Sequence, residues 1–500
     1  MPRIAHKVLI PVLLFVLFGA LVGGCGAGPA GTPIPTDLPP TSVPPTEAQP
    51  TAAIIIQSDA TAAAPSTSVE SPQPTSLNPA GPYIYFRGED RIWISNPDGT
   101  FLKLIAQNVD DRNDLSTALS PDGKALLVIT KEGDEINLME YSLPEGYATK
   151  IDHLLTYTEA DAMKSAGDKT IAYHALQDYP TVAWQPGTGR YIAYAAVRDY
   201  VTTDLHVYDR VTGEITQLTF GNSHTIRPTW SPDGQYILHY GVNWTQPFGG
   251  ALAQYNDFHG AFATRLADGE TVAQPNTERV NFLGWLNDQE YITFNADLDV
   301  TDGCSAGVFK AVNPANRETR LLTDECFLGV VAYSPDMGTI LVSNSSECSC
   351  SPGEGLFLLS PPAYQSKFIL EGYYYEMSWE PENQGFWPYP GPVVSVDGAE
   401  IYNPPPARDA FEASISKLGY EAWKIYQDQE ATVVVKVPGG DWETIMTEKA
   451  DTLIWDPISG DTLLITSTDG RLYRATAPEF VLEQVGEFGK SVKESGWILP

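Results

Sequence analysis

Long apolar runs, basic side chains and cysteines are all scarce in this sequence. The main apolar run, Val8 to Val22, holds about 15 residues, fewer than the roughly 20 that an α-helix needs to cross a bilayer. Lys and Arg together number 30 against 63 Asp and Glu, which leaves a formal net charge of -33. Such a surface repels nucleic acids, so we expect no nucleic-acid partner.

Short motifs of common enzymes are also missing. The sequence contains no Gly-x-Ser-x-Gly elbow, no His-Glu-x-x-His helix, no P-loop and no dinucleotide-binding fingerprint. We therefore expect a non-catalytic binding or scaffold role and no cofactor. The alternative is a hydrolase or lyase acting on a polysaccharide or peptide, because a site built from a His, a Tyr and carboxylates has no sequence motif.

The N-terminus has the pattern of a targeting segment. Basic residues at Arg3 and Lys7 precede the apolar run, which favours a signal peptide over residues 1–24. The run ends on Val22-Gly23-Gly24-Cys25, which resembles a bacterial lipobox. This resemblance implies cleavage before Cys25, a lipid on its sulfur, and an extracytoplasmic protein anchored to a bacterial cell membrane. The alternative is an ordinary signal peptide followed by an incidental cysteine.

Residues 25–80 have the composition of a disordered tether. Residues 26–80 hold 12 of the 40 prolines, contain no Lys or Arg, and are otherwise rich in Thr, Ser, Ala and Gly. Such a segment cannot bury enough apolar surface to fold, apart from the small patch at Ile54–Ile56. We expect it to hold the following domain clear of the membrane.

A short phrase, here called the anchor phrase, recurs through the rest of the chain, most clearly as Trp230-Ser231-Pro232-Asp233-Gly234. The phrase predicts a strand that ends in an aromatic residue, a tight turn, and a second strand. The strand that ends at its aromatic residue is called the anchor strand. Degraded copies place an aromatic or Leu at positions 119, 184, 230, 285, 333, 379 and 455, around a period near 46. Such a period, with four short strands in each unit, is typical of a β-propeller.

The two ends of residues 81–500 decide the number of units. The domain opens on strands without an anchor phrase, and it ends on Ser495 to Leu499, which resembles an anchor strand without a blade. We therefore predict an all-β, eight-bladed β-propeller of four-stranded antiparallel blades, in which the strand near Trp497 closes the ring. Seven blades is the alternative. Insertions near 156–169 and 403–427 each have the pattern of a short helix, and we expect a monomer.

The Trp-Ser-Pro-Asp-Gly phrase, with Leu218-Thr219 ahead of it, resembles the propeller repeat of TolB and related bacterial periplasmic proteins. A similar repeat occurs in the propeller of prolyl oligopeptidases. The resemblance covers nearly all of 83–500 and implies a fold, but it does not imply an activity, because propellers host many functions. The tether occupies the place of TolB's separate N-terminal α/β domain.

Antiparallel order predicts two unlike faces. With strands a, b, c and d in each blade, the a–b and c–d turns share one face, which carries Asp122, Asp233 and Asp336 as caps of their own turns. The b–c loops and d–a links share the other face, here called the long-loop face, where we expect binding of a protein or carbohydrate. The candidate residues on it are Asp199, Tyr200, His224, Trp244, Tyr255, Asp257 and His259.

Two further clusters are predicted on the long-loop face. Four cysteines of an exported domain favour disulfides with open connectivity, and a zinc site is the alternative: Cys304, Cys326, Cys348 and Cys350. Three carboxylates in a short stretch resemble a calcium loop, although their order departs from that of an EF-hand: Asp297, Asp299 and Asp302.

Overall fold

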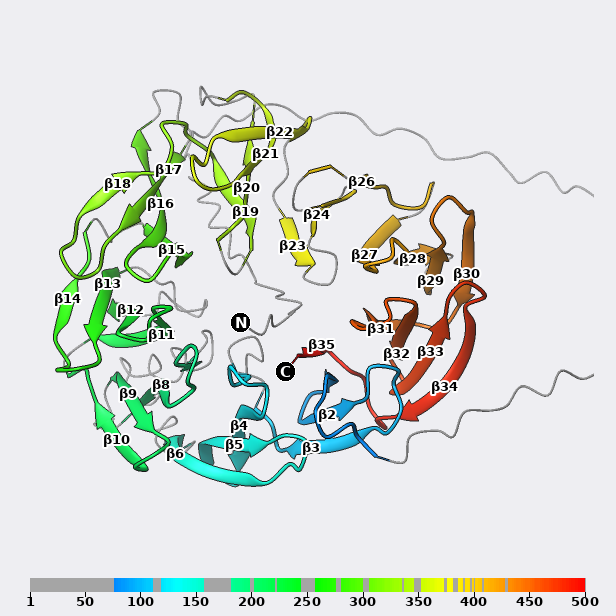
Figure 1. The fold of residues 1–500 in the computed structure, drawn as a ribbon, viewed down its shortest axis with the longest axis horizontal. Helices are drawn as coiled ribbons and strands as arrows, with labels where there is room; N and C mark the ends of the chain where they lie inside the picture. The colour runs from blue at the N-terminus through cyan, green and yellow to red at the C-terminus, as the bar shows by residue number, and fades with distance from the viewer. Residues whose placement is uncertain are drawn as a thin grey trace, which may run out of the picture. The chain divides into compact units, whose positions relative to one another are not determined.

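The computed structural model describes residues 76–110, 118–156, 181–197, 202–220, 223–243, 257–275, 280–299, 305–334, 337–345, 352–372, 376–380, 385–389, 392–395, 398–399, 401–406, 409–427 and 430–499. They form nine antiparallel sheets, eight with four strands and one with three. Figure 1 labels most of the strands, and we number the sheets 1 to 9 in chain order.

Sheet 1 consists of β1 (Tyr83–Arg87), β2 (Arg91–Ser95), β3 (Lys103–Gln107) and the C-terminal β35 (Glu494–Ile498). Sheet 2 consists of β4 (Ala125–Glu132), β5 (Glu135–Ser142) and β6 (Ala148–Thr156). Sheet 3 consists of β7 (Val182–Trp184), β8 (Tyr191–Val197), β9 (Thr203–Asp209) and β10 (Glu214–Gln217). Sheet 4 consists of β11 (His224–Trp230), β12 (Tyr236–Asn243), β13 (Asp257–Arg265) and β14 (Thr271–Ala273). Sheet 5 consists of β15 (Val280–Trp285), β16 (Tyr291–Asp299), β17 (Ser305–Val312) and β18 (Thr319–Leu321). Sheet 6 consists of β19 (Gly329–Tyr333), β20 (Ile340–Asn344), β21 (Gly355–Leu359) and β22 (Ser366–Leu370).

Sheet 7 consists of β23 (Glu376–Glu380), β24 (Gly385–Tyr389), β25 (Val393–Ser395) and β26 (Ile401–Tyr402). Sheet 8 consists of β27 (Asp409–Ile415), β28 (Glu421–Gln427), β29 (Glu430–Lys436) and β30 (Trp442–Met446). Sheet 9 consists of β31 (Ala450–Trp455), β32 (Thr462–Ser467), β33 (Arg471–Thr476) and β34 (Val481–Glu487). Each four-stranded sheet formed by consecutive strands is an up-and-down meander, which is the blade architecture of a β-propeller.

The anchor phrase forms the predicted turn between the first two strands of a sheet. In sheet 4, the Ser231 hydroxyl donates to a carboxylate oxygen of Asp233 (2.6 Å), which itself accepts the main-chain N–H of Gln235 (3.0 Å). Gly234 adopts a φ of 69°, in the left-handed region that glycine enters without steric cost. Asp122 accepts equivalent bonds in sheet 2, so both carboxylates cap their own turns as predicted. Asp336 lies outside the described residues.

Apolar cores lie between neighbouring sheets. Ile237 of sheet 4, for example, packs with Ala193 and Leu205 of sheet 3 in one buried cluster. Comparable clusters lie between all the remaining pairs of consecutive sheets, from sheets 1 and 2 to sheets 8 and 9. A further cluster joins sheet 9 to sheet 1, because Ile454 packs with Ile84. Each sheet is therefore covered by apolar side chains on both faces.

The C-terminal strand completes sheet 1. β35 pairs with β1 so that Trp497 lies opposite Ile84, as the unpaired anchor strand at the end of the sequence predicted. Figure 1 draws this red strand beside the blue strands from the start of the domain. An otherwise open edge of β1 is thereby paired.

The count of eight units is one lower than the number of sheets. Sheet 8 comes from residues 409–446, part of which the sequence analysis assigned to a helical insertion. That prediction was wrong: Trp423 and Tyr426 lie on β28, which pairs with the β-branched β29. Ala413 and Ile415 pair with β28 and are buried in one cluster with Trp423 and Ile425, and this packing outweighs the helix propensity of the Ala and Glu residues in 409–415.

The predicted insertion near 156–169 falls outside the described residues apart from Thr156, which ends β6. No helix in the described part of the chain is long and apolar enough to span a membrane. The predicted signal peptide, Cys25 and nearly all of the tether also lie outside the described residues.

Candidate binding face

The long-loop face is described only in part. Asp199, Tyr200, Trp244 and Tyr255 lie outside the described residues. Asp257 and His259 were assigned to a loop, but both lie on β13, because β12 and β13 extend further than expected and pair Asn243 with Asp257. The connection between these strands is therefore confined to residues 244–256.

His224 is the candidate that the structure describes in full, and its position differs from the prediction. It was expected in an exposed link, but it begins β11 and is only 6% exposed. Its Nδ1 accepts the main-chain N–H of Thr203 at 3.2 Å, which places the proton of a neutral ring on Nε2. His224 therefore connects the start of β9 in sheet 3 to the start of β11 in sheet 4.

A buried carboxylate lies in the same junction. Asp204 is 3% exposed and accepts a hydrogen bond from the Thr219 hydroxyl (3.1 Å), which in turn accepts the N–H of Leu205 (2.8 Å). The Thr203 hydroxyl donates to the Thr225 carbonyl (2.9 Å). These bonds offset the cost of burying Asp204 and hold the d–a link between β10 and β11 in place.

A β-bulge interrupts β11 next to this junction. The register shifts between Ile226 and Thr229, so that Arg227 and Pro228 lie opposite the single residue His239. Bulges also occur in the first strands of sheets 5, 6, 8 and 9. The bulge in β11 differs from them because Arg227 has a left-handed φ of 52°. The side chain of Arg227 is exposed. A left-handed non-glycine residue, here followed by proline, is strained and often marks a functional position.

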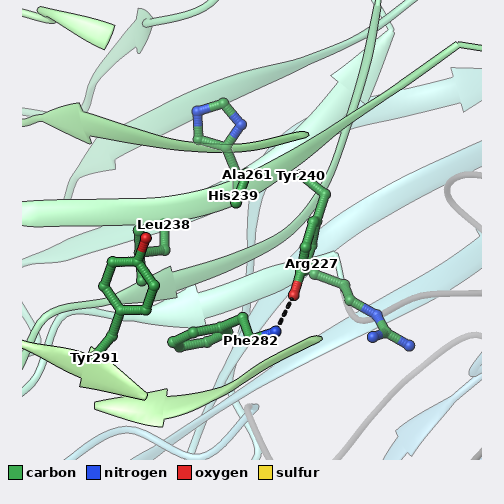
Figure 2. A pocket seen from close by; sticks show the side chains of 7 residues that line it. All are labelled: Arg227, Leu238, His239, Tyr240, Ala261, Phe282 and Tyr291. Atoms are coloured by element: carbon green, nitrogen blue, oxygen red, sulfur yellow. Dashed lines mark hydrogen bonds between the residues drawn. The ribbon is translucent and has the colours of Figure 1, made fainter. Parts of the chain in front are cut away.

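A small hollow lies beside Arg227 (Figure 2). Its volume is only about 10 Å³, room for about one water molecule, and it is lined by Arg227, Leu238, His239, Tyr240, Ala261, Phe282 and Tyr291. The Tyr240 hydroxyl accepts the main-chain N–H of Phe282 in sheet 5 at 2.6 Å. Burial raises the pKa of Tyr240 to about 12, so this phenol keeps its proton at neutral pH.

His239 points to the opposite side of β12 from Tyr240, as neighbours on a strand do (Figure 2). Its Nε2 lies 2.9 Å from the Thr264 hydroxyl, and its ring stacks on Phe262 with a centroid separation of 5.7 Å. Desolvation by burial lowers the pKa of His239 to about 4. It is a neutral core residue at physiological pH, packed behind the strand that lines the hollow.

Arg227 and Tyr240 were not among the residues predicted from the sequence. Arg227 is a basic residue in an acidic chain, and it directly precedes Pro228, which begins a predicted strand. This combination was the signal that could have drawn attention to Arg227. Tyr240 belongs to an apolar strand pattern that does not distinguish a core phenol from one that lines a hollow.

The metal and disulfide predictions remain predictions. Asp297 and Asp299 lie on β16 instead of in a loop, while Asp302 is outside the described residues. No group of three His, Cys, Asp or Glu side chains that could hold a metal occurs in the part of the chain described. Of the four cysteines, only Cys326 is described together with its surroundings. Its carbonyl accepts a bond from the buried amide of Asn344 at 3.3 Å.

No protein-family model matches the sequence, and neither does any curated protein. Among solved structures, dipeptidyl peptidase 4 from Porphyromonas gingivalis aligns over 83% of this chain and 60% of its own, with 10% identity and a TM-score of 0.39. The chain thus spans less than two thirds of that protein. An oligogalacturonate lyase in complex with manganese aligns over 85% of this chain and 99% of its own, with 11% identity and a TM-score of 0.38.

TolB from Acinetobacter baumannii aligns over 75% of this chain and 82% of its own, with 11% identity and a TM-score of 0.25. These values are too low to assign a function to the chain. The assignment of a propeller-type fold rests on the strand order of its own sheets.

Proposed function

We propose that this protein is a membrane-tethered extracytoplasmic β-propeller that serves as a binding scaffold for a protein or carbohydrate partner through its long-loop face. Its nine sheets are the blades of one closed ring, and a lipid on Cys25 anchors the tether. The shared cores between consecutive sheets, and between sheet 9 and sheet 1, support this arrangement.

The observation that supports the binding role is that the connections between strands are longer on one face than on the other. The turn between β11 and β12 is a short segment, residues 231–235, whose polar groups bond to one another. The connection between β12 and β13 at the other end of the same strands occupies residues 244–256. A rigid framework that directs its long connections to one face is a common design for recognition.

Glycan and peptide arrays test the binding role with the lipid-free domain. We expect saturable binding that weakens at least tenfold in Trp244→Ala, since a large aromatic side chain in a long loop is a typical binding anchor. Arg317→Gln, in the c–d turn after β17, is the control that leaves binding unchanged. If the domain instead turns over a polysaccharide or peptide, and if His259→Ala abolishes this turnover, the protein is an enzyme and the scaffold role is wrong.

Membrane fractionation tests the anchor separately. We expect the full chain in the membrane fraction, carrying a lipid on Cys25, and Cys25→Ser in the soluble fraction. An equal distribution of the two proteins would contradict the lipid anchor without bearing on what the domain binds.

A further inference from the structure

A second hollow, much wider than the one beside Arg227, lies at the long-loop end of sheet 9. Its volume is about 470 Å³, within the range of roughly 300–1,000 Å³ that small-molecule sites occupy. Its walls are the d–a link between β30 and β31 and the b–c turn between β32 and β33. The lining consists of residues 447–449 and 467–469 together with Arg471. We call it the sheet 9 hollow.

Main-chain bonds hold the walls of the sheet 9 hollow in place. The N–H of Thr468 in the b–c turn donates to the carbonyl of Lys449 in the preceding link at 3.0 Å. On the other side, the N–H of Phe488 in the link after β34 donates to the carbonyl of Gly470 at 2.6 Å. The backbone of Lys490 lies so close to Gly470 that a side chain at that position would collide with it. A ligand would therefore meet walls that are already ordered.

The b–c turn of sheet 9 repeats the capping of the anchor phrase with one difference. The Ser467 hydroxyl donates to the carboxylate of Asp469 and accepts the main-chain N–H of Arg471 at 3.1 Å. The second residue of such a turn is Pro232 in sheet 4, and proline is sufficient to set this conformation. In sheet 9 the second residue is Thr468, so a hydroxyl that the turn does not require lines the hollow.

Two charged groups of the hollow are occupied within the protein. The Nε–H of Arg471 donates to Asp469 at 2.6 Å, and this bond is the main cause of a pKa of Asp469 below its ordinary value. Nη1 of Arg471 also donates to the Tyr473 hydroxyl at 2.6 Å. Asp469 and Arg471 therefore fix the shape of the turn and cancel each other's charge.

The remaining polar groups of the hollow are available to a ligand. The side chains of Lys449, Thr447 and Thr468 form no hydrogen bond or ion pair with the described residues. Glu448 contacts Arg471 at 3.5 Å through Oε2, but both side chains are exposed, so this pair is weak. The available groups are thus a cation, a carboxylate and two hydroxyls, whose charges sum to zero.

This set of groups matches the hydroxyls of a sugar. A hydroxyl both donates and accepts, so neighbouring hydroxyls of one ring can donate to Glu448 and accept from Lys449. The ligand needs no net charge, because the lining has none. A zwitterionic amino acid would also pair with the two charges, but it would leave the hydroxyls of Thr447 and Thr468 without partners.

We propose that the sheet 9 hollow binds one neutral sugar ring of a glycan. The proposal rests on the binding role proposed above and names the ligand class of one site within it. Lys449 and Glu448 hold neighbouring hydroxyls of the ring, and Thr447 and Thr468 bond to others. Since no lining residue is aromatic, a single ring should bind with a Kd on the order of 1 mM, and repeated contacts along a glycan would raise the affinity.

Ligand-observed NMR tests the proposal with the full chain carrying Cys25→Ser, which lacks the lipid. The probes are the methyl glycosides of glucose, galactose and mannose, with glucuronic acid and alanine as charged comparisons. We expect at least one glycoside to bind, and to bind more tightly than either charged compound. Lys449→Met should weaken this binding at least tenfold and Thr468→Val about threefold, because a charge-assisted hydrogen bond contributes more than a neutral one.

Lys124→Met is the matched control. Lys124 is also an exposed lysine, but it follows the capped turn of sheet 2, on the opposite face, so binding should not change. Lys449→Arg keeps the charge and should keep most of the binding. None of these variants should lower the melting temperature. If Lys449→Met and Thr468→Val lose binding together with a clear fall in melting temperature, both residues are structural and the proposal is overturned.

The absence of glycoside binding, or unchanged binding in Lys449→Met, would also overturn the proposal. Tighter binding of glucuronic acid or alanine would show that the site takes a charged ligand and not a neutral sugar. Array binding that depends on Trp244 but not on Lys449 would leave the scaffold role standing while this inference fails. Glycoside binding that depends on Lys449 alone would support this site and contradict the role proposed for Trp244.

Discussion

The indole Nε1 of Trp230 in sheet 4 donates a 3.0 Å hydrogen bond to the main-chain carbonyl of Ala183 in sheet 3. The relationship recurs: the indole of the anchor tryptophan in one sheet bonds to the anchor-bearing segment of the sheet before it. The other pairs are Trp184 to Ala118 (2.7 Å), Trp455 to Ser414 (3.1 Å) and Trp497 to Trp455 (3.0 Å). The aromatic end of the repeated phrase is therefore a tie between sheets.

Trp230→Phe should lower the free energy of unfolding by about 1–3 kcal/mol, because the buried carbonyl of Ala183 loses its donor. Trp285→Phe is a matched control. Trp285 is also buried, and its Nε1 has no hydrogen-bond partner among the described residues, so its loss removes no bond. Urea unfolding of the two variants measures the difference. Equal destabilisation would show that ring volume, not the indole bond, is what stabilises the anchor.

Removal of residues 494–500 should destabilise the whole domain by more than about 3 kcal/mol. The truncation removes the buried Trp497 and leaves β1 with an open edge. Deletion of residues 26–74 is the control, which should leave the melting temperature unchanged. A truncated domain that melts at the wild-type temperature would contradict a stabilising role for β35.

Stability should fall on acidification because of His239. Its pKa is about 4 in the folded chain against an ordinary value of 6.5, so the unfolded chain binds a proton first as the pH falls. The contribution of His239 is fully present above about pH 6.5 and is lost progressively down to about pH 4. Between pH 7.5 and 5.0 this amounts to about 2 kcal/mol.

Urea unfolding of wild type and His239→Gln at these two pH values tests this prediction. The variant should lose less stability on acidification than wild type does. Parallel losses in the two proteins would assign the pH dependence to other groups.

Disulfides should join the connections that carry the cysteines. The Asn344 amide donates to the carbonyls of both Cys326 and Pro352 (2.8 Å to Pro352), so the link with Cys326 lies beside the end of the connection that contains Cys348 and Cys350. We expect non-reducing peptide mapping to find Cys326 paired with one of these two. Four free thiols together with one equivalent of zinc would contradict the prediction.

Much of the fold could be predicted because its signals are local. Pro232, Asp233 and Gly234 encode a turn whose hydrogen bonds span only a few residues, and alternating strands follow from a period of two. Sheet 8 was missed for the converse reason. Its first strand carries no Trp-Ser-Pro-Asp-Gly phrase, and only its pairing with β28 makes 409–415 a strand.

The candidate site was less predictable than the fold. The sequence pattern placed His224 in a link, yet the structure buries it with Asp204 between sheets 3 and 4, because strand length depends on pairing across the sheet. Arg227 has its left-handed backbone at the bulge where β11 accommodates one extra residue against β12, and the position of that bulge depends on the pairing of the two strands.

By itself, the sequence determined the repeated strand and turn units, the capped Asp-Gly turns and the pairing of the C-terminal strand with β1, since each depends on residues close in the chain or on an unpaired strand at its end. The tertiary structure alone decided the number of sheets, the indole bonds between them and the meeting of Arg227 with Tyr240. These depend on register and on packing between segments far apart in sequence, which local patterns do not specify.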